Sequence, residues 1–131
     1  MKTILTAATL IATLAVSGAA VAQDFVQSGT TPTLPQREGQ AIYNAVCSGC
    51  HMADGRGAEG AGAYPPLANS DFVESPDAVI AWVLNGYRAM PPLGSIMDDE
   101  QVAEVVNYVR HNLGNSYEGS STAADVQAMR E

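Results

Sequence analysis

The sequence predicts an all-α protein with long loops. Three segments carry apolar residues at helical spacing, and no segment shows the regular alternation of a convincing strand. The stretches between them are rich in glycine and proline, which is typical of loops. Because a chain of this size buries only about 60–65% of its surface, three short helices would form a thin core. We therefore expect something apolar to fill the centre of the fold.

The first 22 residues have the organisation of a secretory signal peptide. Lys2 supplies a positive charge, an apolar stretch runs from Ile4 to Val16, and the Ala-Val-Ala run at residues 20–22 fits the small-x-small cleavage pattern. The alternative is a membrane anchor, but the apolar stretch is short for a span of about 20 residues and is diluted by threonine. We expect cleavage after Ala22, and no transmembrane segment in the chain that remains.

The charge balance excludes two classes of partner. The 131 residues include 6 Lys+Arg and 14 Asp+Glu, a formal net charge of −8. All the acidic residues follow residue 22, so the processed chain has five arginines, no lysine and a net charge of −9. Nucleic acid binding needs clustered Lys and Arg for the phosphates, and docking on anionic lipid needs them too. Neither is expected here.

The first helix is expected to follow Pro35 and to run into Cys47. Before it, residues 23–35 are polar, and we interpret them as a flexible N-terminal tail. The residues that recur on one helical face are Gly39, Ile42, Tyr43 and Val46. Residues 53–70 form a Gly- and Pro-rich loop, and a loop of this length is usually functional or wrapped around something.

Two further helices carry clear start signals. Ser75 and Pro76 have the residue types of an N-cap and a first helical position, and Gly86 is a suitable left-handed stop. After a loop at residues 87–97, Asp98 with Gln101 forms a capping box. The apolar stripes are Val79, Ile80, Val83 and Leu84 in one helix, and Val102, Val105, Val106, Val109 and Leu113, stopped by Gly114, in the other.

The organisation is therefore one domain over residues 36–115, followed by a polar C-terminal tail over residues 116–131. A short helical turn is expected in that tail at Ala123–Met129. The length of the processed chain agrees with a single domain, since domains commonly contain about 100–150 residues.

The chemistry is concentrated in the run Cys47-Ser48-Gly49-Cys50-His51, which is the Cys-x-x-Cys-His signature of c-type haem attachment. Two cysteines one helical turn apart can reach the two vinyl groups of a porphyrin edge and form thioethers. The adjacent histidine then places its ring beneath the iron as an axial ligand. These are the only two cysteines, and the export signal suits a haem that is attached outside the cytoplasm.

Three other interpretations of the motif fit less well. A thioredoxin-like site needs a βαβ context, which the sequence does not show. A structural zinc needs four well-spread ligands, and the only other histidine, His111, lies near a helix end where it suits the helix dipole. A disulfide across two residues would be strained and would leave the thin core unexplained.

Methionine is the usual second axial ligand in electron carriers. The candidates after cleavage are Met52, Met90, Met97 and Met129. Met52 directly follows the histidine and cannot reach the opposite face, and Met129 lies in a tail that we expect to be mobile. Met97 occupies the position that staples onto Val102 at a helix start. Met90 precedes two prolines that stiffen its loop, so we predict Met90.

Four motifs in order resemble the class I cytochromes c over residues 36–115. They are Cys-Ser-Gly-Cys-His at 47–51, Tyr-Pro-Pro-Leu at 64–67, Asn-Gly-Tyr-Arg-Ala-Met-Pro at 85–91 and Val-Val-Asn-Tyr-Val-Arg at 105–110. The resemblance implies that the first helix crosses the helix that Asp98 caps, with Gly39 and Tyr43 against Val105 and Tyr108. It also implies that the carbonyl of Pro65 accepts a hydrogen bond from the ring N–H of His51, and that Met90 is the distal ligand.

A narrower resemblance is to the small cytochromes that accompany periplasmic dehydrogenases of bacteria, carried by Leu-Gly-Asn-Ser-Tyr at 113–117 and by Asp125-Val126. It implies a periplasmic one-electron carrier, not an enzyme, with one haem c. The donor would be a dehydrogenase or reductase, and the acceptor an oxidase or another cytochrome. Two alternatives stay open: a fixed subunit of a dehydrogenase complex, and a five-coordinate haem protein that binds ligands or acts like a peroxidase.

Overall fold

The computed structural model describes residues 33–60 and 62–130. The expected signal peptide at residues 1–22, and the expected tail up to residue 32, lie outside the described residues. Within the described part of the chain, no helix is both long enough and apolar enough to cross a membrane.

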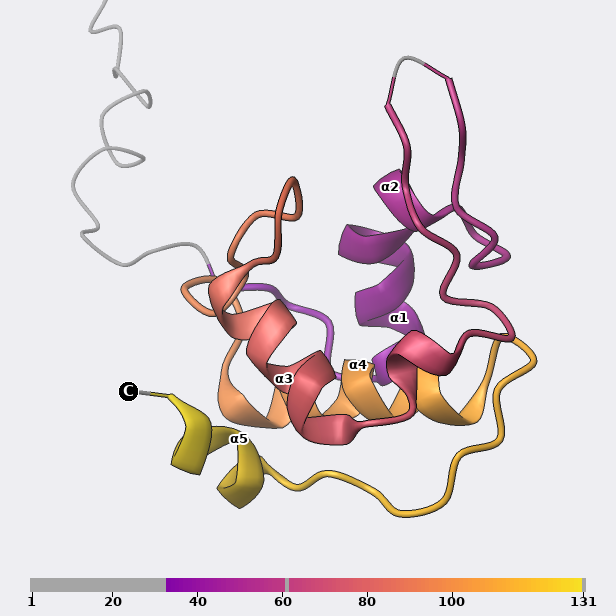
Figure 1. Ribbon diagram of the computed structural model, residues 1–131. Helices are drawn as coiled ribbons and strands as arrows, with labels where there is room; N and C mark the ends of the chain where they lie inside the picture. Colours follow the sequence, from indigo (N-terminus) through magenta and orange to yellow (C-terminus); the bar gives the residue numbers. More distant parts are fainter. Residues whose placement is uncertain (1–32, 61, 131) are drawn as a thin grey trace, which may run out of the picture.

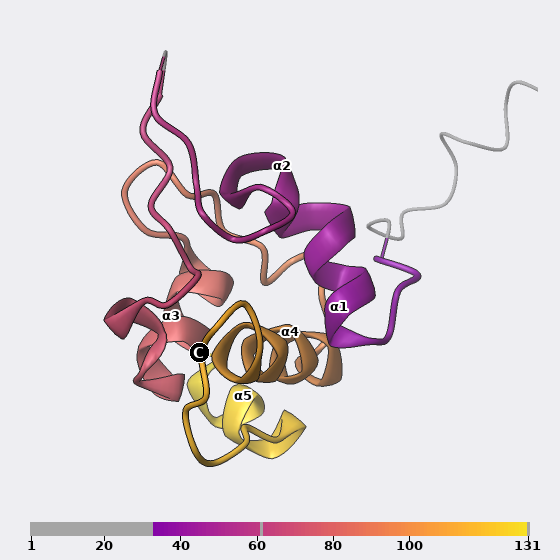
Figure 2. The same ribbon diagram turned by 90° about the vertical axis from the view of Figure 1, so that its right-hand side faces the viewer.

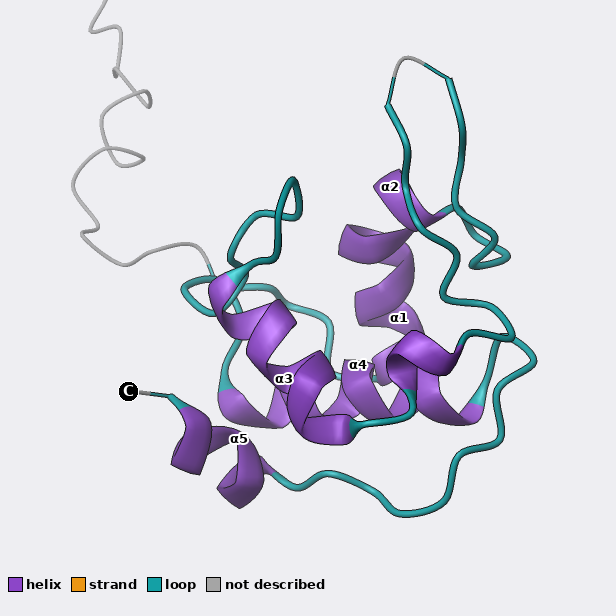
Figure 3. Ribbon diagram, in the orientation of Figure 1, coloured by secondary structure: helices purple, strands orange, loops and turns teal. Residues whose placement is uncertain are grey.

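The described residues are helical, with loops between the helices and only two isolated β-bridges, so the predicted all-α class is confirmed (Figure 3). One unbroken helical run passes from α1 through a π-helical turn into α2. The elements are α1 (Gly39–Ile42), the π turn (Tyr43–Cys47), α2 (Ser48–His51), a 3₁₀ turn (Asp71–Val73), α3 (Pro76–Asn85), α4 (Asp99–His111) and α5 (Ala123–Met129).

The two N-terminal caps predicted from the sequence, at Ser75 and Asp98, are formed. Ser75 accepts a hydrogen bond from the Ala78 N–H at 3.4 Å, with Pro76 in the first turn of α3. Asp98 and Gln101 make the reciprocal bonds of a capping box, at 2.9 and 3.0 Å. Each pair satisfies backbone donors that would otherwise lack partners at a helix start.

The end of α4 differs from the prediction. The helix stops at His111 instead of continuing to Gly114, and Leu113 has a left-handed φ of 57° outside the helix. The reason is that Asn115 takes over the helix end: its side-chain amide donates to the Val109 carbonyl at 2.8 Å. The Tyr117 N–H meets the Arg110 carbonyl at 3.1 Å in the same way.

The helix crossing between α1 and α4 is confirmed, and it is very close (Figures 1 and 2). A Cβ atom at Gly39 would lie 2.3 Å from the Glu104 carbonyl oxygen and 2.8 Å from the Tyr108 Cβ. One turn further along, the rings of Tyr43 and Tyr108 pack with centroids 5.4 Å apart. Only glycine allows the two backbones to approach this far.

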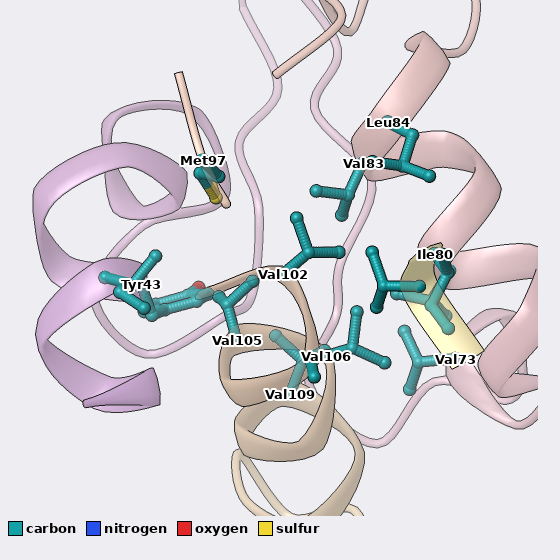
Figure 4. Packing of buried hydrophobic residues seen from close by; sticks show 14 residues of the cluster. Tyr43, Val73, Ile80, Val83, Leu84, Met97, Val102, Val105, Val106 and Val109 are labelled. Carbon is teal, nitrogen blue, oxygen red and sulfur yellow. The ribbon is translucent and has the colours of Figure 1, made fainter. Parts of the chain in front are cut away.

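The buried core lies around α4 (Figure 4). Side chains of α3 pack against one side of α4, and Tyr43 and Met97 lie towards the other side. The members are Ile42, Tyr43, Val73, Val79, Ile80, Val83, Leu84, Met97, Val102, Ala103, Val105, Val106, Val109 and Val126. The core therefore connects all the main helices, and Val126 brings α5 into it.

The C-terminal segment packs closely against the domain. The helical turn expected at Ala123–Met129 is present as α5, which lies against α4 with Val126 fully buried. Met129 is partly buried against the core, so the expectation that it is mobile is wrong. The hydrophobic contact of Val126, which local sequence features do not reveal, is what holds this short helix in place.

Arg110 joins this segment to the rest of the fold. Arg110 is 3% exposed, and its guanidinium donates to the carbonyls of Val73, Glu74, Glu118 and Gly119 at 2.8–3.2 Å. A buried charge is costly unless its donors are satisfied. The four carbonyls satisfy them, and in doing so they fix the chain after α4 to the chain before α3.

We predict that Gly39→Ala lowers the free energy of unfolding by about 1–3 kcal/mol, because the new methyl group meets the backbone of Glu104. Denaturant unfolding followed by circular dichroism measures this change. Gly49→Ala is the matched control, since it lies in the same helical run with no atom within 4 Å of its added Cβ. It should cause no loss and can stabilise by up to about 1 kcal/mol through helix propensity, and equal losses of stability at the two positions would contradict the crossing.

Candidate functional site

The Cys-x-x-Cys-His motif lies on the last turns of the first helical run. Cys47 ends the π turn, while Cys50 and His51 belong to α2. Cys47 is partly buried and Cys50 is exposed, and both are free thiols. Burial, with a smaller contribution from Cys50, raises the pKa of the Cys47 thiol to about 12. Cys47 is therefore a protonated thiol at neutral pH.

The ring of His51 is oriented by the loop that follows it. Its Nδ1 lies 2.9 Å from the carbonyl oxygen of Pro65. A carbonyl oxygen only accepts hydrogen bonds, so Nδ1 must carry the proton and donate. In the neutral imidazole, Nε2 then keeps a free lone pair. This arrangement is that of a metal-ligating histidine fixed by a backbone carbonyl, and it is the contact that the sequence resemblance implies.

Gly57 makes this contact possible. It has a left-handed φ of 68°, and a Cβ there would lie 2.1 Å from the Tyr64 carbonyl oxygen and 3.0 Å from that of Pro65. Its N–H donates to the His51 carbonyl at 3.0 Å. From the sequence alone, Gly57 is one of several glycines in the predicted loop at residues 53–70. The signal that could have identified it is its position between the motif and the Pro-Pro pair.

The base of the same loop is held by Tyr43 and Asn115. The buried Tyr43 hydroxyl donates to the Met52 carbonyl at 2.7 Å, and burial raises the pKa of Tyr43 to about 12, so it remains a neutral donor. At the other end, the Asn115 amide donates to the Leu67 carbonyl at 2.7 Å. Residues 52 and 67 are thus both attached to the helical core.

Met90 lies in a tight turn after α3. The Tyr87 and Met90 backbones exchange two hydrogen bonds, at 3.1 and 2.9 Å, and Arg88 between them has a φ of 54°. Gly86 is required here because a Cβ would lie 2.6 Å from the Met90 carbonyl oxygen. Met90 is partly buried against the core, whereas Met97 is 3% exposed and belongs to it.

The segment that carries His51 and the loop that carries Met90 lie on the same side of α4. Both views show α2 and the loop between α3 and α4 projecting from that side, with the loop containing Pro65 alongside (Figures 1 and 2). His111, by contrast, is at the end of α4, where its Nε2 lies 2.9 Å from the Gly119 carbonyl oxygen. That position agrees with the structural role expected for it.

The donor set fits a c-type haem. It consists of two thiols one helical turn apart, an imidazole with a directed lone pair, and methionine thioethers. Several apolar side chains pack against the core without being fully buried by the chain: Val46, Leu67, Trp82, Leu93 and Ile96. Apolar side chains that the chain leaves partly exposed suit contact with a porphyrin. Among residues 33–60 and 62–130, no three His, Cys, Asp or Glu side chains gather in a way that could hold a metal ion.

Taken together, an all-helical fold with this motif and this histidine geometry defines a class I c-type cytochrome. Comparison with known proteins agrees. The family model described as cytochrome c oxidase, cbb3-type, subunit III matches residues 35–109, which is more than half of the chain. The chain belongs to this family of c-type cytochrome domains, whose members transfer electrons and carry out no bond chemistry of their own.

The relatives are of two kinds. The chain is 32% identical over 121 residues to the cytochrome c subunit of a quinone alcohol dehydrogenase from Gluconacetobacter polyoxogenes, which covers 82% of this chain and 25% of that protein. It is 33% identical over 76 residues to cytochrome c6 of Microcystis aeruginosa, covering 55% and 90%. The predicted similarity to dehydrogenase cytochromes is confirmed, although this chain spans about a quarter of the length of those subunits.

Among solved structures, cytochrome c6 from the diatom Phaeodactylum tricornutum is 26% identical with a TM-score of 0.46, covering 69% of this chain and 92% of that one.

We predict that Gly57→Ala lowers the free energy of unfolding by about 2 kcal/mol or more, because a methyl group meets the Tyr64 carbonyl and φ is left-handed. Denaturant unfolding of the haem-containing protein measures it. Gly62→Ala is the control, since its nearest neighbours are the atoms of the Tyr64 ring at 3.5 Å, and its change should stay below about 0.5 kcal/mol. A smaller loss of unfolding free energy at Gly57 than at Gly62 would contradict the close packing of Gly57 against the Tyr64 carbonyl.

Proposed function

We propose that the chain is a periplasmic one-electron carrier with a single haem c, attached through Cys47 and Cys50 and ligated by His51 and Met90. The observation that carries this proposal is the contact between His51 Nδ1 and the Pro65 carbonyl, which leaves Nε2 free on the residue that directly follows Cys50. When bound, the haem supplies a one-electron iron couple.

The residues of the chain orient and shield that couple. Pro65 holds the His51 ring and makes its free nitrogen more basic. The Met90 thioether is a soft ligand that favours reduced iron and raises the potential. The turn at residues 87–90 fixes the backbone of Met90, because its N–H and carbonyl are both bonded to Tyr87 and Gly86 packs closely against it.

The sequence and the relatives support the proposed location and partners. Cleavage of a signal peptide after Ala22 would release the protein into the periplasm. The donor is a dehydrogenase or reductase, which the cytochrome subunits of alcohol, fructose and gluconate dehydrogenases among the relatives support. The acceptor is an oxidase or another cytochrome. A net charge of −9 without lysine disfavours any partner that docks through an acidic face.

A second candidate is a fixed cytochrome subunit of a dehydrogenase complex. The matches to subunits of quinone alcohol dehydrogenase and gluconate 2-dehydrogenase favour it. Copurification distinguishes the two functions. A fixed subunit stays with a dehydrogenase through size-exclusion chromatography at physiological salt, and a free carrier elutes alone.

We predict one covalent haem per chain. Cys47→Ala or Cys50→Ala should reduce the yield of mature protein because one thioether is lost, and His51→Ala should abolish it. Intact-mass spectrometry and the pyridine haemochrome spectrum measure the attachment. Ser48→Ala, at an intervening position where the hydroxyl bonds the Asn44 carbonyl at 2.8 Å, is the control and should mature normally. Maturation without His51 at the wild-type level would refute the proximal assignment.

We predict that Met90→Ala abolishes the far-red thioether-to-iron absorption band, lowers the reduction potential and opens the iron to small ligands. Met97→Ala should keep the band and reduce stability by about 2–5 kcal/mol, because Met97 is buried in the core. Spectra and potentiometry of both variants measure this. Loss of the band in Met97→Ala, together with its survival in Met90→Ala, would reverse the assignment, and its absence from the wild type would favour a five-coordinate haem.

A further inference from the structure

Arg130, the residue after α5, connects the C-terminal helix to the loop that carries Met90. Its Nε donates to the Asp99 carboxylate at 2.7 Å, its Nη1 to the Gly94 carbonyl, and its Nη2 to the Met97 carbonyl at 3.0 Å. The side chain is about two-thirds buried, being 34% exposed. One guanidinium thus joins the loop before α4 to the first turn of α4.

The backbone of this loop has other attachments, but they come from two places. The N–H groups of Leu93 and Gly94 donate to the carbonyls of Val83 and Leu84 in α3, at 2.9 and 3.3 Å. On the N-terminal side, the Leu34 N–H donates to the Ile96 carbonyl at 3.1 Å. Arg130 adds charged donors to two loop carbonyls, and hydrogen bonds to charged groups are about twice as strong as neutral ones.

The position of Arg130 is set by α5. Thr122 and Asp125 form a capping box at the start of that helix, and Val126 is fully buried against the core. The matched family region ends at residue 109, so this attachment is made by a part of the chain outside the common domain.

We propose that Arg130 is a positioning residue. It holds the loop between α3 and α4 against α4 and so keeps Met90 in place as a ligand of the iron. The proposal rests on the proposed ligation by Met90. The contacts of Arg130 exist only while residues 94–97 stay in place, so they favour the ligated arrangement over an open one. Removing them raises the fraction of molecules in which Met90 is displaced and the iron can bind another ligand.

The geometry of the Arg130 side chain indicates that lysine would replace it only in part. The planar fork of a guanidinium serves two carbonyls and one carboxylate at once. A lysine ammonium is a point charge that can keep the attraction to Asp99 but cannot reproduce this spread of donors. The fraction of molecules with Met90 displaced should therefore be larger in Arg130→Lys than in the wild type and smaller than in Arg130→Met.

The test is a titration of the ferric holoprotein with imidazole, followed by the loss of the far-red thioether band. Apparent affinity rises in proportion to the fraction of open molecules. We expect Arg130→Met to bind imidazole about tenfold more tightly, which is the effect of about 1.4 kcal/mol, and Arg130→Lys to show a smaller increase. Arg37→Met is the matched control, because Arg37 pairs with Asp98 at the same helix start, and it should stay within about twofold of the wild type.

The outcomes separate the two proposals. An imidazole affinity of Arg130→Met equal to that of the wild type, in a wild type that shows the far-red band, overturns the role of Arg130 alone. Equal increases in Arg130→Met and Arg37→Met also overturn it, since the effect would then be general destabilisation. A wild type without the band overturns the ligation by Met90, and the role of Arg130 with it.

Discussion

The close approach of α1 and α4 at Gly39 is the contact on which the site depends. It brings the Tyr43 ring against Tyr108, and this burial directs the Tyr43 hydroxyl to the Met52 carbonyl, one residue after the histidine. The chain therefore leaves α2 in a fixed direction. From there Gly57 lets the returning segment of the loop come close enough for the Pro65 carbonyl to reach the His51 ring.

How much the sequence predicts depends on the range of the interaction. The caps at Ser75 and Asp98 are made by residues three apart, and the Cys-x-x-Cys-His motif is continuous, so their signals are local and the structure forms both caps as expected. The contact between His51 and Pro65 was implied only by the resemblance to a family. The end of α4 could not be predicted, because Asn115 competes for its last carbonyls from outside the helix. The docking of α5 through Val126 is likewise a tertiary effect that no periodicity in seven residues reveals.

The arginines explain how so acidic a chain holds its loops together. Arg110 is buried against four carbonyls and no carboxylate, and Arg130 joins two carbonyls to Asp99. Arg37 pairs with Asp98, and Arg88 lies 5.1 Å from the centre of the Tyr87 ring. Guanidinium groups suit this use because they present several donors in a plane and remain charged. The loops are attached through backbone carbonyls, which every residue has, so the attachment places little demand on the loop sequences.

The outer surface of the protein is dominated by negative charge. Arg110 is buried, and Arg37, Arg56 and Arg130 each pair with a carboxylate. Most of the 14 acidic side chains therefore determine the electric field that an approaching protein meets. Against that background, Tyr64 and Tyr87 are 41% and 50% exposed, and they stand on the two loops that carry Pro65 and Met90. Transient redox interfaces are small, at less than about 1,200 Å², and exposed aromatic side chains suit such a contact. The surrounding negative charge repels partners with acidic docking faces. The negative electric field of the surface would then select between partners, and the loops that carry Pro65 and Met90 would make the electron-transfer contact.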